Sequence, residues 1–138
     1  ILLELPNHSL SSYVFNTIER LKQRGITSAI AHPERNFAIQ KDKRLMRYLI
    51  KRGALSQITG SSLTGEFSLD SLCAVELLRS GLAHVIASDA HSLEGRRPLG
   101  LLKTVIEAAR IVGKDRAKVL VKANPKKIVM GEPFSSIN

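Results

Sequence analysis

Short segments of the chain carry carboxylate and imidazole groups at the ends of apolar runs. Glu4 lies in Ile-Leu-Leu-Glu-Leu, His32 opens His-Pro-Glu-Arg, and Asp89 and His91 belong to Ser-Asp-Ala-His. Carboxylates and imidazoles together are typical ligands of a divalent metal ion, and a carboxylate can bridge neighbouring ions. Such ions lower the pKa of a bound water and hold phosphoryl oxygens. This set of residues therefore suits phosphoester hydrolysis.

Two arginines lie close to these segments in the sequence. Arg35 ends the His-Pro-Glu-Arg segment, and Arg96 follows His91 by five residues. The guanidinium group is planar and always charged, and its paired donors match the oxygens of a phosphate dianion. Metal-type ligands together with arginines therefore predict a site that binds and hydrolyses a phosphate ester.

The apolar pattern predicts the elements that must position these groups. Four short apolar runs are predicted to be buried strands: residues 1–5, 26–31, 54–59 and 82–88. Five longer stretches are predicted to be helices: residues 11–24, 42–53, 68–81, 98–113 and 115–123. Asn124 and Pro125 are expected to end the last of these helices. Apolar strands that alternate with helices favour an α/β fold, with about four parallel β/α units in one sheet covered by helices.

The predicted strands bring the polar groups to one rim. Ligands of parallel α/β folds bind at the carboxyl ends of the strands, where Glu4, His32 and the Asp89–His91 pair all fall. If the chain leaves its strand extended, the spacing of Asp89 and His91 points both side chains to one face. Taken singly, each group also has an ordinary interpretation as an exposed charge, a loop residue or a helix cap. Agreement among four positions favours a shared site.

Composition excludes several classes of protein. The chain has 138 residues, which we expect to form a single domain, and a formal net charge of +9. No apolar run approaches the roughly 20 residues needed to cross a bilayer. The one cysteine, Cys73, excludes an intrachain disulfide, and its leucine-rich helical setting predicts buried packing rather than a nucleophile. The positive charge suits an anionic partner, but aromatic residues make up only 4%, which argues against base stacking.

Several motifs in order resemble a known family. The segments ILLELP, AHPERN, QITGSS, ASDAH and ANPKKIVMGE resemble the bacterial capsule- and exopolysaccharide-associated tyrosine phosphatases of the PHP (polymerase and histidinol phosphatase) superfamily. The resemblance covers essentially the whole chain, but the His-x-His motif and other ligands of the family's first half have no match here. It implies a partial distorted (β/α)7 barrel. Since Ile1 lies inside a predicted strand, we expect the chain to be the C-terminal part of a longer protein.

The resemblance also implies a site, a cofactor and a partner. The implied metal ligands are Glu4, His32, Asp89 and His91, and the implied phosphate-binding residues are Arg35 and Arg96. The complete barrel would hold two or three Mn²⁺ ions, with Fe, Zn or Mg as alternatives. The implied substrate is the phosphotyrosine tail of the kinase that controls polysaccharide export. The implied location is the cytoplasm, with no DNA partner, no membrane insertion, and self-association through exposed sheet edges.

Alternatives to this function remain open from the sequence. With only part of the ligand set, this chain alone is expected to be weakly active or inactive. Another PHP phosphoesterase, acting on histidinol phosphate or a nucleotide, would use similar residues. A basic module without enzymatic activity, which binds nucleic acid or an anionic surface, would need no metal and would bind less tightly at high salt.

Overall fold

A four-stranded parallel sheet forms the centre of the protein. The computed structural model describes residues 1–91 and 101–134. The strands are β1 (Leu2–Glu4), β2 (Ala29–Ala31), β3 (Leu55–Thr59) and β4 (Val85–Ala87). They lie in the order β1-β2-β3-β4, and all three neighbouring pairs are parallel. The predicted α/β fold with four parallel β/α units is therefore confirmed.

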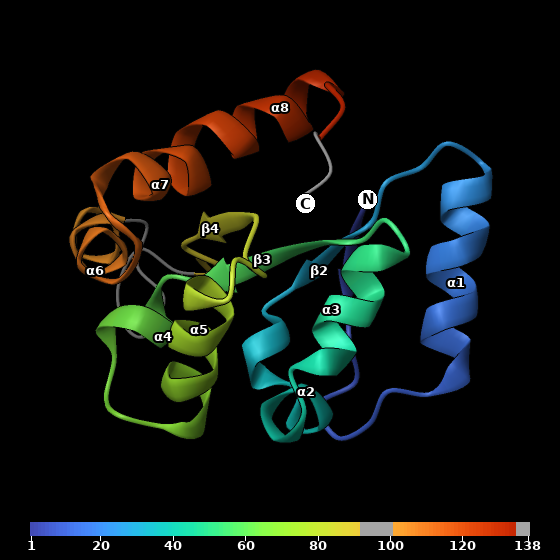
Figure 1. The fold of residues 1–138 in the computed structure, drawn as a ribbon, viewed down its shortest axis with the longest axis horizontal. Coiled ribbons are helices and arrows are strands. Elements are labelled where there is room, and N and C mark those ends of the chain that lie inside the picture. The colour runs from blue at the N-terminus through green and yellow to red at the C-terminus, as the bar shows by residue number, and fades with distance from the viewer. Residues whose placement is uncertain (92–100, 135–138) are drawn as a thin grey trace.

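Helices connect the strands and extend beyond the last one. They are α1 (Ser12–Gln23), η1 (Pro33–Arg35), α2 (Phe37–Lys41), α3 (Arg44–Lys51), α4 (Ser61–Thr64), α5 (Leu69–Arg79), α6 (Leu102–Val112), α7 (Lys114–Lys118), η2 (Val119–Ala123) and α8 (Asn124–Met130). Figure 1 shows the chain from α7 to α8 as one continuous arm along the top of the view, with α2 at the bottom. The short elements η1, α2 and α4 were not predicted from the sequence. No helix in the described ranges is long and apolar enough to cross a membrane.

One face of the sheet packs against the helices through alternating strand residues. Ile30, Ile58 and Ile86 share this face by register and are almost fully buried. They form one hydrophobic cluster with residues that include Ile18 of α1 and Leu77 of α5. Burial of each such side chain contributes about 1.5–3 kcal/mol relative to exposure. This packing fixes the strands, and therefore fixes where their carboxyl ends lie.

The predicted stop at Asn124–Pro125 is wrong, because the chain passes through it into α8. Pro125 has no N–H for the carbonyl of Val121, and in a regular α-helix its ring would crowd that carbonyl. The turn before it is π-helical: the N–H of Asn124 donates to the carbonyl of Val119. This wider turn relieves the crowding. The side chain of Asn124 also donates to the carbonyl of His84 at 2.7 Å, which ties the arm to the residue before β4.

The start of α5 offers a direct test of local stability. Ser68 Oγ accepts from the N–H of Ser71 at 3.2 Å, and Ser71 Oγ accepts from the N–H of Ser68 at 2.9 Å. We expect Ser68→Ala to lower the free energy of unfolding by about 1 kcal/mol, because it leaves a helix N–H without its partner. Urea unfolding measures the loss. Ser80→Ala, at the exposed other end of α5, should change stability by less than about 0.5 kcal/mol.

Candidate functional site

A short turn places His32 and Arg35 beyond the carboxyl end of β2. β2 ends at Ala31, and His32 takes a left-handed conformation with φ 32° and ψ 56°. Pro33, whose ring fixes φ, then begins η1, and the N–H of Arg35 donates to the carbonyl of His32 at 3.0 Å. The backbone therefore reverses immediately after the strand. As a result, both candidate side chains lie within one compact turn.

Glu4 and His32 meet across the first two strands. Glu4 is in register with Ala31, the residue before His32. The distance between Glu4 Oε1 and His32 Nε2 is 3.4 Å. The His32 side chain is 10% exposed and that of Glu4 is 71% exposed, so the pair lies at the surface of the rim with the imidazole underneath. The two predicted ligands are thus brought together.

Asp89 joins the His32–Arg35 turn to the segment after β4. Arg35 Nη1 donates to Asp89 Oδ2 at 3.2 Å. His91 Nδ1 lies 3.9 Å from Asp89 Oδ1 and 2.8 Å from the carbonyl oxygen of Asp89. The expected extended exit from the strand is wrong, because Asp89 has φ 54°. The two side chains are neighbours through a turn rather than through strand alternation.

Backbone strain coincides with the candidate site. Within the described ranges, His32 and Asp89 are the two non-glycine residues with positive φ. A left-handed conformation is uncommon for a residue that carries a side chain, and it persists only where the surrounding structure imposes it. Strained residues of this kind cluster at functional sites. The strain therefore favours a functional interpretation of both residues over an ordinary loop role.

Glu34 is a neighbour of the site that the sequence pattern does not single out. Its side chain is fully buried (0% exposed), and its Oε1 accepts from the N–H of Thr59 at 2.9 Å and from Ser62 Oγ at 2.8 Å. Burial raises the pKa of Glu34 to about 7, although these two hydrogen bonds lower it in part. The carboxylate connects η1 with the end of β3 and with α4. The sequence shows only that Glu34 lies between the candidate residues His32 and Arg35. Its burial is seen only in the structure.

The donor atoms fit a divalent metal ion in kind, while the described residues supply few of them in any one place. Glu4 with His32 and Asp89 with His91 each pair a carboxylate with an imidazole, which suits such an ion. In residues 1–91 and 101–134, no group of three or more His, Cys, Asp or Glu could hold a metal. A catalytic zinc site uses three protein ligands. Each pair therefore supplies part of a ligand shell. Arg96 lies outside the described residues.

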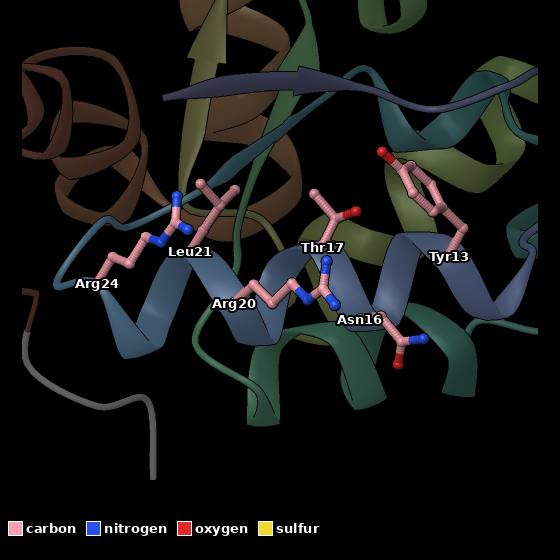
Figure 2. A pocket seen from close by; sticks show the side chains of 6 residues that line it. All are labelled: Tyr13, Asn16, Thr17, Arg20, Leu21 and Arg24. Atoms are coloured by element: carbon pink, nitrogen blue, oxygen red, sulfur yellow. The ribbon is translucent and has the colours of Figure 1, made fainter.

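Two cavities in the described part of the chain lie away from these residues. A hollow of about 360 Å³ is lined by residues of α1, including Tyr13 and Arg20, and by Arg24, which follows the helix. Figure 2 shows these side chains. A second cavity of about 500 Å³ lies at the amino ends of the strands, between Leu2 of β1 and Ile128 of α8. Neither is lined by a candidate ligand or by Arg35.

The predicted role of Cys73 as core packing is confirmed. Its side chain is 2% exposed, and burial raises the pKa of the thiol to about 12. A thiol in this state does not supply the thiolate that a cysteine nucleophile needs. His84 is also buried, and its Nδ1 accepts from the N–H of Ser56 at 3.1 Å. Both residues lie outside the candidate site, which for Cys73 agrees with the prediction from the sequence.

Comparisons with known proteins place this geometry in a family. The family described as "Capsular polysaccharide synthesis, CpsB/CapC" matches residues 1–130. The chain is 37% identical over 97 residues to the tyrosine-protein phosphatase YwqE of Bacillus subtilis (strain 168), covering 70% of this chain and 38% of that protein. It is 31% identical over 137 residues to the tyrosine-protein phosphatase CpsB of Streptococcus pneumoniae, covering 95% of this chain and 56% of that protein.

A solved structure supports the same relationship. The chain matches a crystal structure from work on YwqE of Bacillus subtilis and CpsB of Streptococcus pneumoniae, described as metal-dependent tyrosine phosphatases, with a TM-score of 0.88 and 27% identity. The match covers 97% of this chain and 54% of that one. The chain thus spans about half the length of the relatives it matches. The partial-barrel fold that the resemblance implied is confirmed.

Proposed function

This chain belongs to the CpsB/CapC family of capsular polysaccharide synthesis, and from this premise we propose that it forms part of a metal-dependent protein-tyrosine phosphatase. The observation that carries the proposal is the contact at 3.2 Å between Arg35 Nη1 and Asp89 Oδ2. It sets a guanidinium group, which suits phosphate, beside a carboxylate that suits a metal ion. The relatives named above are phosphatases, which supports this interpretation of the contact.

Four residues are proposed to hold metal ions, with Mn²⁺ as the proposed ion. They are Glu4, His32, Asp89 and His91, which the structure arranges as two pairs at the rim. A bound divalent ion would supply a water of lowered pKa and a positive charge for phosphoryl oxygens. The left-handed turns at His32 and Asp89 hold the side chains of these two residues in fixed directions. Further ligands from outside the described residues would complete the shell.

The arginines are proposed to bind the phosphate group. Arg35 carries its charge on a turn that Pro33 and a hydrogen bond to His32 hold rigid, so little conformational freedom is lost when phosphate binds. Its five N–H donors can contact Asp89 and phosphate oxygens at the same time. Such donors stabilise charge on the equatorial oxygens in the bound substrate as well as in the transition state. Arg96 is proposed as a second donor to the phosphate group, because its guanidinium group has the same charge and paired N–H donors.

The proposed substrate is a phosphotyrosine-containing protein in the cytoplasm. A kinase tail that carries phosphotyrosine is the specific candidate, because the motif resemblance implied it and the family is described as one of capsular polysaccharide synthesis. The formal net charge of +9 supports attraction of an acidic, phosphorylated segment. Self-association through the exposed sheet edge at β1 is proposed as well, since edge strands leave backbone groups open for pairing.

The test joins this chain to the part of a relative's chain that the match does not cover. Residues 1–130 replace the matching segment of CpsB from Streptococcus pneumoniae, and hydrolysis of a phosphotyrosyl peptide is measured with Mn²⁺. We expect turnover that EDTA removes and Mn²⁺ restores, whereas this chain alone should be weakly active or inactive because it supplies two ligand pairs. A chimaera that prefers histidinol phosphate would indicate another phosphoesterase. A folded chimaera without any turnover would contradict the proposal.

A further inference from the structure

The burial of the Glu34 carboxyl group costs free energy and needs a physical explanation. Its carboxyl group is fully buried, and Oε2 has no hydrogen-bond partner among the described residues. Replacement of a buried charged group by an apolar one of similar volume is often neutral or stabilising, so stability alone is a weak reason to keep it. The residue stands directly between Pro33 and Arg35 in η1. Its contacts, rather than its contribution to the core, indicate what it does.

The contacts of Glu34 tie the turn after β2 to the end of β3. Oε1 accepts from the N–H of Thr59, the last residue of β3, and from Ser62 Oγ in α4. On the other side, Gln40 Nε2 donates to the carbonyl of Glu34 at 2.8 Å and to Asp70 Oδ1 at 2.7 Å. Side-chain and main-chain groups of one residue therefore hold η1 from two directions. The turn cannot shift without loss of these hydrogen bonds.

The position of Arg35 depends on this connection. Arg35 follows β2, but its guanidinium contacts Asp89, which follows β4, so the side chain must reach across the end of β3. Glu34 draws η1 toward that end through the N–H of Thr59. The next residue is thereby aimed at the rim between β3 and β4. Without the hydrogen bond from the N–H of Thr59 to Glu34, η1 has no side-chain hydrogen bond to β3 among the described residues.

We propose that Glu34 is a positioning residue, which holds the turn that presents Arg35 to the phosphate group of the substrate. This inference rests on the proposed phosphatase function. In this role Glu34 acts on its neighbour through the Thr59 and Ser62 contacts, rather than by binding the substrate itself. Its effect is therefore on phosphate affinity more than on the chemical step. Short buried hydrogen bonds of this kind hold a charged side chain within about 0.5 Å of its working position.

The test compares two replacements that differ in whether they keep an acceptor oxygen. In the CpsB chimaera, Glu34→Leu should raise KM for the phosphotyrosyl peptide, and the inhibition constant of orthophosphate, by about 10-fold or more, with a smaller change in kcat. Glu34→Gln retains a carbonyl oxygen for Thr59 and Ser62 and should restore both constants to within about threefold of wild type. Equal values of both constants for Leu and Gln would overturn the proposal.

A double substitution separates positioning from a general loss of structure. If Glu34 acts through Arg35, then Glu34→Leu adds nothing to the loss of phosphate affinity in Arg35→Ala, because both changes remove one interaction. Additive losses would overturn the proposal. The matched control is Glu76→Leu, which removes an exposed carboxylate paired with Lys43 at 2.8 Å and should leave both constants unchanged. Loss of phosphate affinity in that variant would also overturn it.

A measurement on this chain alone, outside the chimaera, keeps this inference distinct from the proposed function. The NMR signal of the Arg35 guanidinium reports its contact with Asp89 without any turnover. We expect the wild-type signal in Glu34→Gln and a shifted, fast-exchanging signal in Glu34→Leu, with both variants folded by circular dichroism. An unchanged signal in folded Glu34→Leu overturns the positioning role. Lack of turnover in the wild-type chimaera would overturn the phosphatase function and leave this result to decide the role of Glu34.

Discussion

Cys73→Ala is expected to leave phosphatase activity of the chimaera within about twofold of wild type, whereas His91→Ala lowers it by on the order of 100-fold. The reason lies in where each side chain is placed. Cys73 is buried in α5, and burial raises the pKa of its thiol to about 12, so it offers no thiolate to attack phosphorus. His91 lies at the rim beside Asp89, where a metal ligand is proposed. Steady-state kcat/KM with a phosphotyrosyl peptide measures both effects.

The control for this pair is stability. Cys73→Ala removes a buried sulfur and should cost about 1 kcal/mol of unfolding free energy without loss of the site. His91→Ala, at an exposed position, should leave the unfolding temperature within about 2 °C of wild type. Cys73→Ala should therefore lower stability and leave activity intact, whereas His91→Ala should lower activity and leave stability intact. Loss of activity in folded Cys73→Ala would contradict metal-dependent hydrolysis and support a cysteine nucleophile.

The strand ends were predictable because their signals are local. Apolar runs that stop at Glu4 and before His32 locate two carboxyl ends, and the run before Asp89 locates a third. The structure places β1, β2 and β4 there. Register then brings Glu4 beside His32 without further information, because adjacent parallel strands align their ends. The sheet and the rim residues could thus be derived from patterns a few residues long.

The geometry within the rim could not be derived in this way. Asp89 leaves β4 in a left-handed conformation, while the local sequence Ser-Asp-Ala-His is compatible with an extended exit. Glu34 is buried only because Thr59 and Ser62, 25 and 28 residues away, supply hydrogen bonds. Pro125 continues a helix only because a π-helical turn precedes it. Each depends on contacts that form after the elements pack, so tertiary structure decides them.

The stability of the chain should depend on pH through His84. This imidazole is buried, and burial, followed by the charge of Arg116, lowers its pKa from 6.5 to about 4. Its Nδ1 accepts from the N–H of Ser56 at 3.1 Å, so protonation of that nitrogen would cost this hydrogen bond. Between pH 6.5 and 4 the unfolded chain binds a proton at His84 that the folded chain does not. The folded state therefore loses stability as the pH falls through this window.

His84→Asn isolates this contribution, because the amide oxygen of asparagine can replace Nδ1 as an acceptor while the side chain does not titrate. Urea unfolding at pH 7 and pH 4 gives the free energy of each protein. We expect the wild type to lose about 3 kcal/mol relative to the variant over that interval, the value of a shift from 6.5 to about 4. Glu34 has a raised pKa of about 7, which makes folding less favourable as pH rises. This contribution is the same in both proteins, so it cancels in the difference between their unfolding free energies. If the unfolding free energies of the two proteins changed with pH in parallel, His84 would be protonated equally in the folded and unfolded states. Its Nδ1 would then not be held as the acceptor of the Ser56 N–H.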